Sequence, residues 1–304
     1  MPPSGPFPQF LRAKLTASSM SGTQVAVAAA VAGVGAYALY LRKSAGANAT
    51  DKPSLASFGF HSLRLHSTEL VSHNVKRLRF ELPNATQPGG LSLTSALLTI
   101  SIPAGRWLPV LRPYTPVNSL DETGFVELMV KHYPGGKQSS HLHSLKPGDR
   151  LTVAPIKGLS WTPNKHPHVA LIAGGAGITP MYQLTQGILN NPGDKTRITL
   201  VWGVNTDSEI FLAEQFGALQ KKFPDRFKAI YVVATPESSS PHPKGFITKQ
   251  ILEDAGLIAS SEKNKDIKVL VCGPPPMEKA LKGAMSKPGV LAELGYSPAQ
   301  IYSF

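Results

Sequence analysis

Four short motifs combine glycine, proline and polar side chains in the way that phosphate-bearing cofactors require. They are RPYTP at 112–116, GGKQSS at 135–140, GGAGITP at 174–180 and CGPPPM at 272–277. The glycines of the second motif open an expected helix, and a helix N-terminus offers unpaired N–H groups and the positive end of a dipole to a phosphate. Alone, each motif is equally an ordinary strand end, a glycine hinge or a proline stop. Only their combination is informative.

The third motif departs from the usual dinucleotide fingerprint. It follows an apolar strand and opens a helix, but the last position of G-x-G-x-x-G/A is occupied by Pro180. Proline is accepted in the first turn of a helix. The motif therefore predicts a phosphate-binding turn, but not one of the ordinary dehydrogenase type.

The composition limits which redox chemistry the chain can perform. Its 304 residues include one cysteine, Cys272, which excludes a disulfide scaffold, a cysteine-ligated zinc site and a four-cysteine iron–sulfur cluster. We find no Ser/His/Asp arrangement and no pair of catalytic carboxylates, and we predict no metal site. Any redox chemistry would therefore be carried by an organic cofactor or by a metal held by other residue types.

The charge is unevenly distributed along the chain. Lys and Arg number 31 against 19 Asp and Glu; the first 50 residues hold four of the basic residues and no acid, which leaves 27 basic against 19 acidic residues in the rest. Such an excess favours an acidic partner, a membrane surface or nucleic acid. No nucleic-acid-binding motif is present, so an acidic protein partner is the favoured interpretation.

The first two motifs lie among short β-strands. The expected strands are 63–71, 75–82, 96–102, 111–115, 125–131 and a final one beginning at Arg150, with one helix at 139–145. Many short strands without long helices between them indicate a β-barrel or sandwich.

The last two motifs lie where strands and helices alternate. The expected strands are 168–174, 197–203, 227–234 and 268–273, followed by helices at 180–189, 208–223, 248–256 and 277–285. Alternation with nearly continuous apolar strands predicts a parallel sheet covered on both faces, with ligands at the carboxyl ends of its strands. We expect three regions: 1–56 as a targeting segment, anchor and linker, 57–160 as the β-barrel, and 161–304 as the α/β domain.

The N-terminal region contains an uncharged stretch at residues 25–41. Its 17 residues include seven Ala and two Gly, and Arg42 and Lys43 follow directly. A helix of this length is at the short end of what spans a bilayer. We favour a membrane anchor behind an acid-free mitochondrial targeting flank. The alternatives are a cleaved secretory signal and a helix that belongs to the fold.

The four motifs, in this order and spacing, resemble the ferredoxin–NADP reductase superfamily, and most closely its NADH–cytochrome b5 reductases. The resemblance covers residues 58–304 and implies a β-barrel FAD domain plus an α/β parallel-sheet NAD domain, preceded by an N-terminal membrane-anchor helix. It implies that NADH gives a hydride to FAD and that electrons then pass singly to cytochrome b5. The N-terminus is similar to the mitochondrial fungal branch, which implies a single-pass protein of the mitochondrial outer membrane, with a cleaved intermembrane-space form as an alternative.

The resemblance also implies roles for individual residues. Arg112 would pair with the FAD pyrophosphate, Tyr114 would lie against the flavin, and Thr115 would stand near the hydride-accepting N5 atom. Thr115 and Cys272 are the expected catalytic residues. The other expected cofactor-binding residues are Pro113, Met129, Lys131, Tyr133, Gly136, Lys137, Gln138, Ser139, Gly175, Gly177, Thr179, Glu209, Gly273, Pro274 and Met277.

Several of these positions have plainer interpretations. Tyr133 could equally be an aromatic residue in a turn, and Cys272 could be a small residue at the end of a strand. Glu209 could be an acid that the dipole of a helix favours at the helix N-terminus. The family function of Glu209 would be to disfavour the 2′-phosphate of NADPH. Many relatives have Met where Gln138 stands, and Thr where Ala176 stands.

The resemblance leaves the electron acceptor open. The basic residues Lys131, Lys146, Arg150 and Lys157 are expected to face the acidic haem protein cytochrome b5, and a solvated charged surface is the alternative. A quinone or an ascorbyl-type radical would need the same cofactor residues. A non-catalytic nucleotide sensor is the candidate from another class, although RPYTP argues against it. We expect a monomer that binds no nucleic acid.

Overall fold

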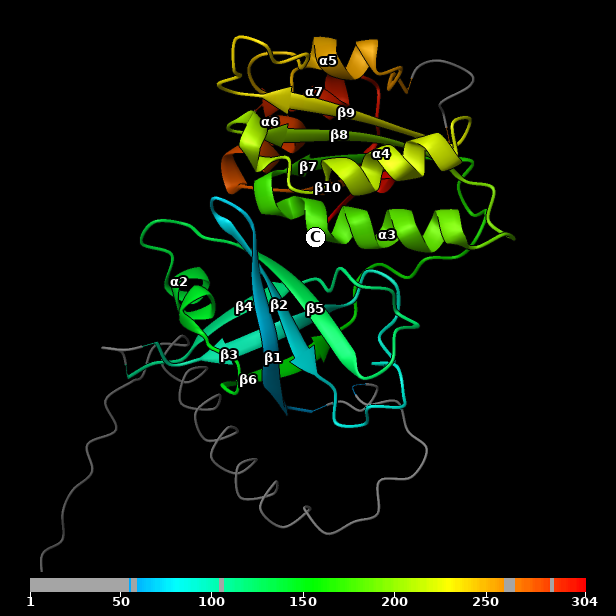
Figure 1. Ribbon diagram of the computed structural model, residues 1–304. Helices are drawn as coiled ribbons and strands as arrows, with labels where there is room; N and C mark the ends of the chain where they lie inside the picture. Colours follow the sequence, from blue (N-terminus) through cyan, green and yellow to red (C-terminus); the bar gives the residue numbers. More distant parts are fainter. Residues whose placement is uncertain (1–54, 56–58, 104–106, 260–265, 285–286) are drawn as a thin grey trace, which may run out of the picture. The chain divides into compact units, whose positions relative to one another are not determined.

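The computed structural model describes residues 55, 59–103, 107–259, 266–284 and 287–304 (Figure 1). The predicted anchor at 25–41, with nearly all of the predicted region 1–56, lies outside these residues. Within the described part, no helix is both long and apolar enough to cross a membrane.

Six antiparallel strands and one helix make up the first half of the described chain. The strands are β1 (His61–Ser72), β2 (Val75–Glu81), β3 (Ala96–Ser101), β4 (Val110–Tyr114), β5 (Phe125–Lys131) and β6 (Arg150–Ile156), and the helix is α2 (Lys137–Ser144). Each predicted strand is confirmed to within two residues. Apolar and polar residues alternate along the strands because successive side chains point to opposite faces of a sheet. In β1, for example, Leu63 and Leu65 lie on the same face, and both are buried.

The predicted barrel is an open sheet. Its strand order is β4-β3-β6-β1-β2-β5, and among the described residues no ladder of hydrogen bonds joins β4 to β5. Helix α2 contacts both of these edge strands. The RPYTP motif therefore begins in an edge strand, whose last three residues are 112–114, and the helix that GGKQSS opens lies beside it.

The second half contains a parallel sheet with the order β13-β10-β7-β8-β9. Its strands are β7 (His168–Gly174), β8 (Arg197–Val204), β9 (Phe227–Val233), β10 (Lys268–Cys272) and β13 (Ile301–Ser303). The chain runs outward from β7 to β8 and β9, then returns to place β10 on the other side of β7. This reversal is a topological switch point, and ligands of such sheets bind outside the carboxyl ends of the strands there. At this switch point, β7 ends at Gly174 and β10 ends at Cys272.

Helices cover both faces of the parallel sheet (Figure 1). On one side, Leu171 of β7 packs in a cluster with α3 (Ile178–Asn190) and α4 (Ala213–Lys222). On the other, Ile172 packs with α5 (Lys249–Asp254), α6 (Pro275–Lys282) and α7 (Val290–Glu293). Two-residue strands β11 (Gly283–Ala284) and β12 (Lys287–Pro288) form a small hairpin.

The predicted continuous helix at 208–223 is wrong at its start. A single 3₁₀ turn at Asp207–Glu209 precedes α4. The backbone turns here because the Glu209 carboxylate accepts a hydrogen bond from the Asn205 N–H at 3.0 Å, and because Leu212 is fully buried. Local pattern could not predict this break, since the buried partner of Glu209 comes from the other half of the chain.

Candidate functional site

All four motifs line one cavity of about 890 Å³ between the two sheets. This volume lies within the range of small-molecule sites. Fifteen of the nineteen predicted cofactor residues line it: Arg112, Pro113, Tyr114, Thr115, Met129, Tyr133, Gly136, Lys137, Gln138, Ser139, Gly177, Thr179, Cys272, Gly273 and Pro274. Lys131, Gly175, Glu209 and Met277 do not.

The start of α2 forms a close-packed cradle. Gly135 has a φ of +73°, a conformation that favours glycine. A Cβ on Gly136 would lie 2.5 Å from the Ser139 Oγ and 2.9 Å from the Tyr133 carbonyl oxygen. The Ser139 hydroxyl accepts a hydrogen bond from the Tyr133 N–H at 3.2 Å. The turn is thus fixed before any ligand binds, with the N-terminal end of the helix directed at the cavity.

Gln138 is held by the interior of the first sheet. Its amide nitrogen donates to the Thr99 Oγ1 at 2.8 Å, and its carbonyl oxygen accepts from the Ser101 Oγ at 2.6 Å. The side chain is 3% exposed. This polar residue is stable in a buried position because two hydroxyls of β3 form hydrogen bonds with it.

Arg112 and Tyr114 reach the cavity from the edge strand β4. The Arg112 guanidinium is exposed and donates only to its neighbour, the Leu111 carbonyl, at 2.7 Å. Its remaining donors are directed to no other described residue. Burial, with a smaller contribution from Tyr133, raises the pKa of Tyr114 to about 12, although Arg112 opposes this. Tyr114 therefore remains a neutral hydrogen-bonding group at neutral pH.

The two loops at the switch point pack tightly against each other. A Cβ on Gly174 would lie 2.6 Å from the Met277 Sδ and 2.8 Å from the Pro274 Cδ, and a Cβ on Gly177 would collide with the Cys272 carbonyl. Met277 supports the loop from behind instead of lining the cavity. The glycines of the third motif are thus needed for the close approach of the two loops.

Cys272 ends β10 at the cavity with a protonated thiol. Burial, and secondarily the nearby carboxylate of Glu278, raises its pKa to about 12. A thiol with this pKa is not a nucleophile at neutral pH. A role for Cys272 beside the nicotinamide would therefore use the neutral thiol.

Lys131 and Glu209 form a buried ion pair outside the cavity. The Lys131 Nζ lies 2.7 Å from the Glu209 Oε2, and the two side chains are 7% and 8% exposed. Asn74 of the β1–β2 turn also donates to Glu209, at 3.0 Å. Lys131 therefore does not face a protein partner, and that expectation is wrong: the alternation of β5 turns it towards the half that contains the parallel sheet.

Burial alone raises the pKa of Glu209. Three partners outweigh that effect: Lys131, through a hydrogen bond and its charge, and the Asn205 N–H and the Asn74 side chain, through hydrogen bonds. The pKa of Glu209 therefore lies below its ordinary value. Glu209 is therefore ionised and engaged at neutral pH.

The segment after RPYTP is held from two directions. Gln183 and Gln186 of α3 donate to the carbonyl oxygens of Pro116 and Val117, at 3.0 and 3.1 Å. From the other side, the Val117 N–H donates to the Glu127 carbonyl at 2.9 Å.

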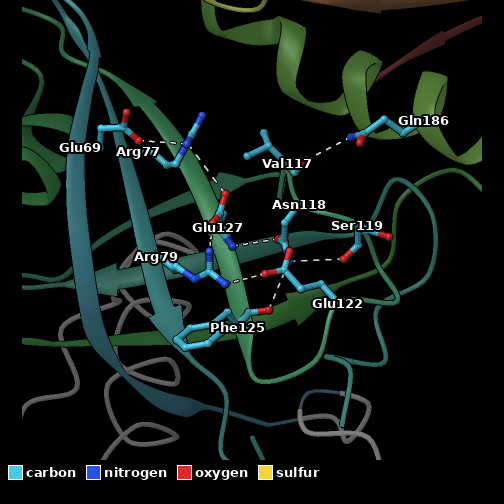
Figure 2. A network of polar contacts seen from close by, with 10 residues as sticks. All are labelled: Glu69, Arg77, Arg79, Val117, Asn118, Ser119, Glu122, Phe125, Glu127 and Gln186. Atoms are coloured by element: carbon cyan, nitrogen blue, oxygen red, sulfur yellow. Dashed lines mark hydrogen bonds and ion pairs between the residues drawn. The ribbon is translucent and has the colours of Figure 1, made fainter. Parts of the chain in front are cut away.

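Figure 2 shows how this segment continues into a polar network on β2 and β5. The Asn118 Oδ1 accepts from the Glu127 N–H at 2.9 Å. Arg79 pairs with Glu127 at 2.9 Å and with Glu122 at 2.7 Å, and its guanidinium carbon lies 4.2 Å from the centre of the Phe125 ring. The loop that carries Thr115 into the cavity is thus anchored by charged residues of the sheet.

Sequence reasoning missed two aromatic residues at the C-terminus. Tyr302 and Phe304 line the cavity, and their rings meet edge to face at 5.1 Å. Strand β13 is three residues long, too short for a periodic pattern. Lys157, expected on a docking face, also lines the cavity and is exposed.

Comparison with known proteins agrees with this division. The model of an oxidoreductase FAD-binding domain matches residues 62–159, and that of an oxidoreductase NAD-binding domain matches residues 171–283. NADH-cytochrome b5 reductase 2 of Pyricularia oryzae is 44% identical over 302 residues, covering 94% of this chain and 90% of the relative. The protein of the same name from Emericella nidulans is 41% identical over 297 residues, covering 94% and 91%.

A solved structure supports the same assignment. The cytochrome b5 reductase domain of Ulva prolifera nitrate reductase superposes with a TM-score of 0.74 at 31% identity, covering 84% of this chain and all of that one. With its FAD-binding and NAD-binding domains meeting at one cavity, the chain belongs to the NADH–cytochrome b5 reductase family of FAD-dependent oxidoreductases.

Proposed function

We propose that the chain transfers electrons from NADH, by way of FAD, to cytochrome b5. The observation that carries the proposal is the single cavity in which the RPYTP and GGKQSS motifs of the FAD-binding domain meet the switch-point loops of the NAD-binding domain. Bound FAD would supply the hydride acceptor and the single-electron donor, and so couple a two-electron donor to a one-electron acceptor.

The residues present fit both cofactors. The Gly136 turn leaves no room for a side chain, and its helix N-terminus and the free donors of Arg112 suit a pyrophosphate. The glycines beside Met277 and Cys272 let the two switch-point loops pack directly against each other, and both loops line the cavity where a nicotinamide ring would lie. No described cluster of His, Cys, Asp or Glu could hold a metal ion.

In this proposal the side chains and backbone amides of the chain bind the two cofactors and orient them. Arg112, Lys137 and the first amides of α2 would bind the FAD pyrophosphate, Tyr114 would position the flavin, and Thr115 would offer its hydroxyl beside the reacting atoms. Gly177, Thr179 and the loop from Cys272 would hold the nicotinamide against them. Neither a general acid nor a general base is required for hydride transfer.

We propose that NADH is preferred to NADPH because the region after β8 is acidic. Asp207 and Glu209 lie there, and the Glu209 carboxylate is ionised. Lys131 neutralises much of the charge of Glu209 within the pair. Asp207 is partly exposed, and its carboxylate, which accepts hydrogen bonds from the Glu237 N–H and the Ser240 hydroxyl, would contribute to the repulsion of a 2′-phosphate.

Cytochrome b5 is proposed as the acceptor because the relatives carry that name and because exposed basic residues are available. Lys146, Arg150 and Lys157 are exposed on the FAD-binding half, while Lys131 is not. Steady-state assays of the FAD-loaded chain with NADH test this choice. Reduction of cytochrome b5 should be faster than that of a quinone and should slow as ionic strength rises; equal rates, or no salt dependence, would contradict it.

We further propose that residues 25–41 anchor the chain, as a monomer, in the mitochondrial outer membrane. The uncharged sequence and its acid-free flank support this. The full chain should remain with mitochondria after alkaline extraction, and a form lacking residues 1–51 should be released. Extraction of the full chain would contradict the anchor.

A further inference from the structure

The face of α3 turned to the FAD-binding half carries residues at i, i+4, i+7 and i+8. They are Thr179, Gln183, Gln186 and Gly187, and this spacing places them on one side of a helix. Thr179, the second residue of the helix, lines the cavity. The two glutamines donate to the segment that follows Thr115.

The backbone of this segment has no spare polar groups. Pro116 has no N–H, its carbonyl accepts from Gln183, and Val117 uses its carbonyl for Gln186 and its N–H for the Glu127 carbonyl. The segment is fixed on one side by β5 and on the other by α3. Its position therefore depends on the helix that also carries the nicotinamide-side motif.

Gln183 is an unusual choice for a purely structural position. The side chain is 2% exposed, and its Oε1 is buried without a hydrogen-bond partner in the described structure. A buried acceptor without a partner is unfavourable, so an apolar side chain of the same size would serve packing better. What Gln183 supplies, and an apolar residue cannot, is the donor to the Pro116 carbonyl.

The helix also approaches the FAD-binding half closely at Gly187. A Cβ there would lie 2.8 Å from the Leu93 Cδ2, and closer still to the Leu93 Cδ1. This contact lies more than one helical turn beyond Gln183, so α3 is restrained along its length and not only at its first turn.

We infer that Gln183 is a positioning residue for hydride transfer, assisted by Gln186, and that α3 sets the spacing between the two cofactor rings. At its first turn the helix supports the nicotinamide loop, and one to two turns later it holds the segment next to Thr115. The inference rests on the proposed function. Because hydride transfer depends steeply on the distance between donor and acceptor, loss of the Gln183 donor should slow it more than it weakens NADH binding.

The test compares Gln183→Leu with Thr185→Val in the full chain loaded with FAD. Thr185 is a matched control, since it is fully buried on the same helix and its hydroxyl bonds only within that helix, to the Met181 carbonyl at 2.8 Å. Two measurements are made: hydrogen exchange of the backbone amides of residues 115–119, and anaerobic stopped-flow reduction of the flavin over a range of NADH concentrations.

We expect Gln183→Leu to speed exchange at the Val117 amide and to lower the limiting rate of flavin reduction at least about tenfold, with the NADH dissociation constant changed less than about threefold. Thr185→Val should match the wild type in both measurements. The inference would be overturned if Gln183→Leu has the amide exchange and the limiting rate of flavin reduction of the wild type. It would also be overturned if Thr185→Val lowers that rate as much as Gln183→Leu does.

Gln186→Leu covers the case in which Gln183→Leu does not fold, because Gln186 is only partly buried. It should show the same two changes to a smaller degree, and an unchanged variant would count against the inference. If NADH fails to reduce even the wild type, the proposed function fails, and the exchange measurement still decides whether the glutamines hold the segment.

Discussion

At the scale of single residues, Cys272 shows how position determines reactivity. Its thiol lies at the cavity, but burial and then Glu278 raise its pKa to about 12, so almost none of it is thiolate at pH 8. Iodoacetamide should modify the folded, FAD-loaded chain at least about 100-fold more slowly than the chain unfolded in guanidinium. Because Cys272 is the sole cysteine, mass spectrometry reads its modification directly, and similar rates in the two states would contradict the assignment.

The Lys131–Glu209 pair links the two halves through charge. Both side chains are more than nine-tenths buried, so removing one partner leaves a buried charge without compensation. Lys131→Met and Glu209→Gln should each lower the free energy of unfolding by about 3 kcal/mol at pH 7, and the double variant should lose clearly less than the sum. Urea unfolding measures all three, and additive losses would show that the pair does not interact.

The same pair predicts a pH dependence with a definite sign. The pKa of Glu209 is lower in the folded chain than its ordinary value of 4.5, so its stabilising effect is complete above that value and is lost as the pH falls through the lowered pKa. The stability difference between the wild type and Glu209→Gln should stay constant from pH 7 to about pH 5 and then narrow. A difference that grows on acidification would contradict the ionised pair.

At this scale the sequence predicted residue types better than residue partners. Fifteen of nineteen expected residues line the cavity, because they belong to motifs whose local backbone places them there. Lys131 and Glu209 were each expected at a cofactor, and their pairing with each other was not predicted. Their contact joins two halves that are separated in the sequence, and no local pattern describes such a contact.

At the scale of elements, the start of α2 is determined by close packing. Gly136 has an ordinary φ of −71°, yet a Cβ would crowd the Ser139 hydroxyl and the Tyr133 carbonyl. Gly136→Ala should therefore lower FAD affinity at least about tenfold by displacing the first turn, a cost of about 1.4 kcal/mol or more. Fluorescence titration of the apoprotein with FAD measures it.

Gly217 provides the matched control for this substitution. It lies inside α4, and a Cβ there would meet nothing within 4 Å. Gly217→Ala should leave FAD affinity unchanged and raise stability by about 0.5–1 kcal/mol. Equal FAD affinities for Gly136→Ala and Gly217→Ala would show that the turn is not a cofactor cradle.

The elements that the sequence predicted are those with a strong period. Strand β7 is buried at every position, and its bounds match the expectation at both ends. Strand β13 and the break before α4 were missed, since the first is too short to show a period and the second depends on a distant ion pair. The predicted antiparallel strands of the first half are present, while their order and the contacts of α2 with both edge strands have no local signal in the sequence.

At the scale of the whole molecule, strand order creates the site. Placing β10 beside β7, opposite β8, brings Gly174 and Cys272 to one switch point. The cluster on α3 includes Val117 and Met129 from the other half, so the two sheets share part of one core. Sequence alone predicted both domains and the edge at which ligands bind, but not the strand order or the contacts of α3 that connect the halves.

The central claim is that this cavity joins FAD to NADH for hydride transfer. The most direct measurement is an anaerobic titration of the purified, FAD-loaded chain with NADH, followed by visible absorbance, with NADPH titrated in parallel. The account predicts that the yellow absorbance bleaches with about one equivalent of NADH and far less readily with NADPH. The claim would be contradicted if the chain stays colourless after FAD is added. It would also be contradicted if the bound flavin remains oxidised when NADH is added.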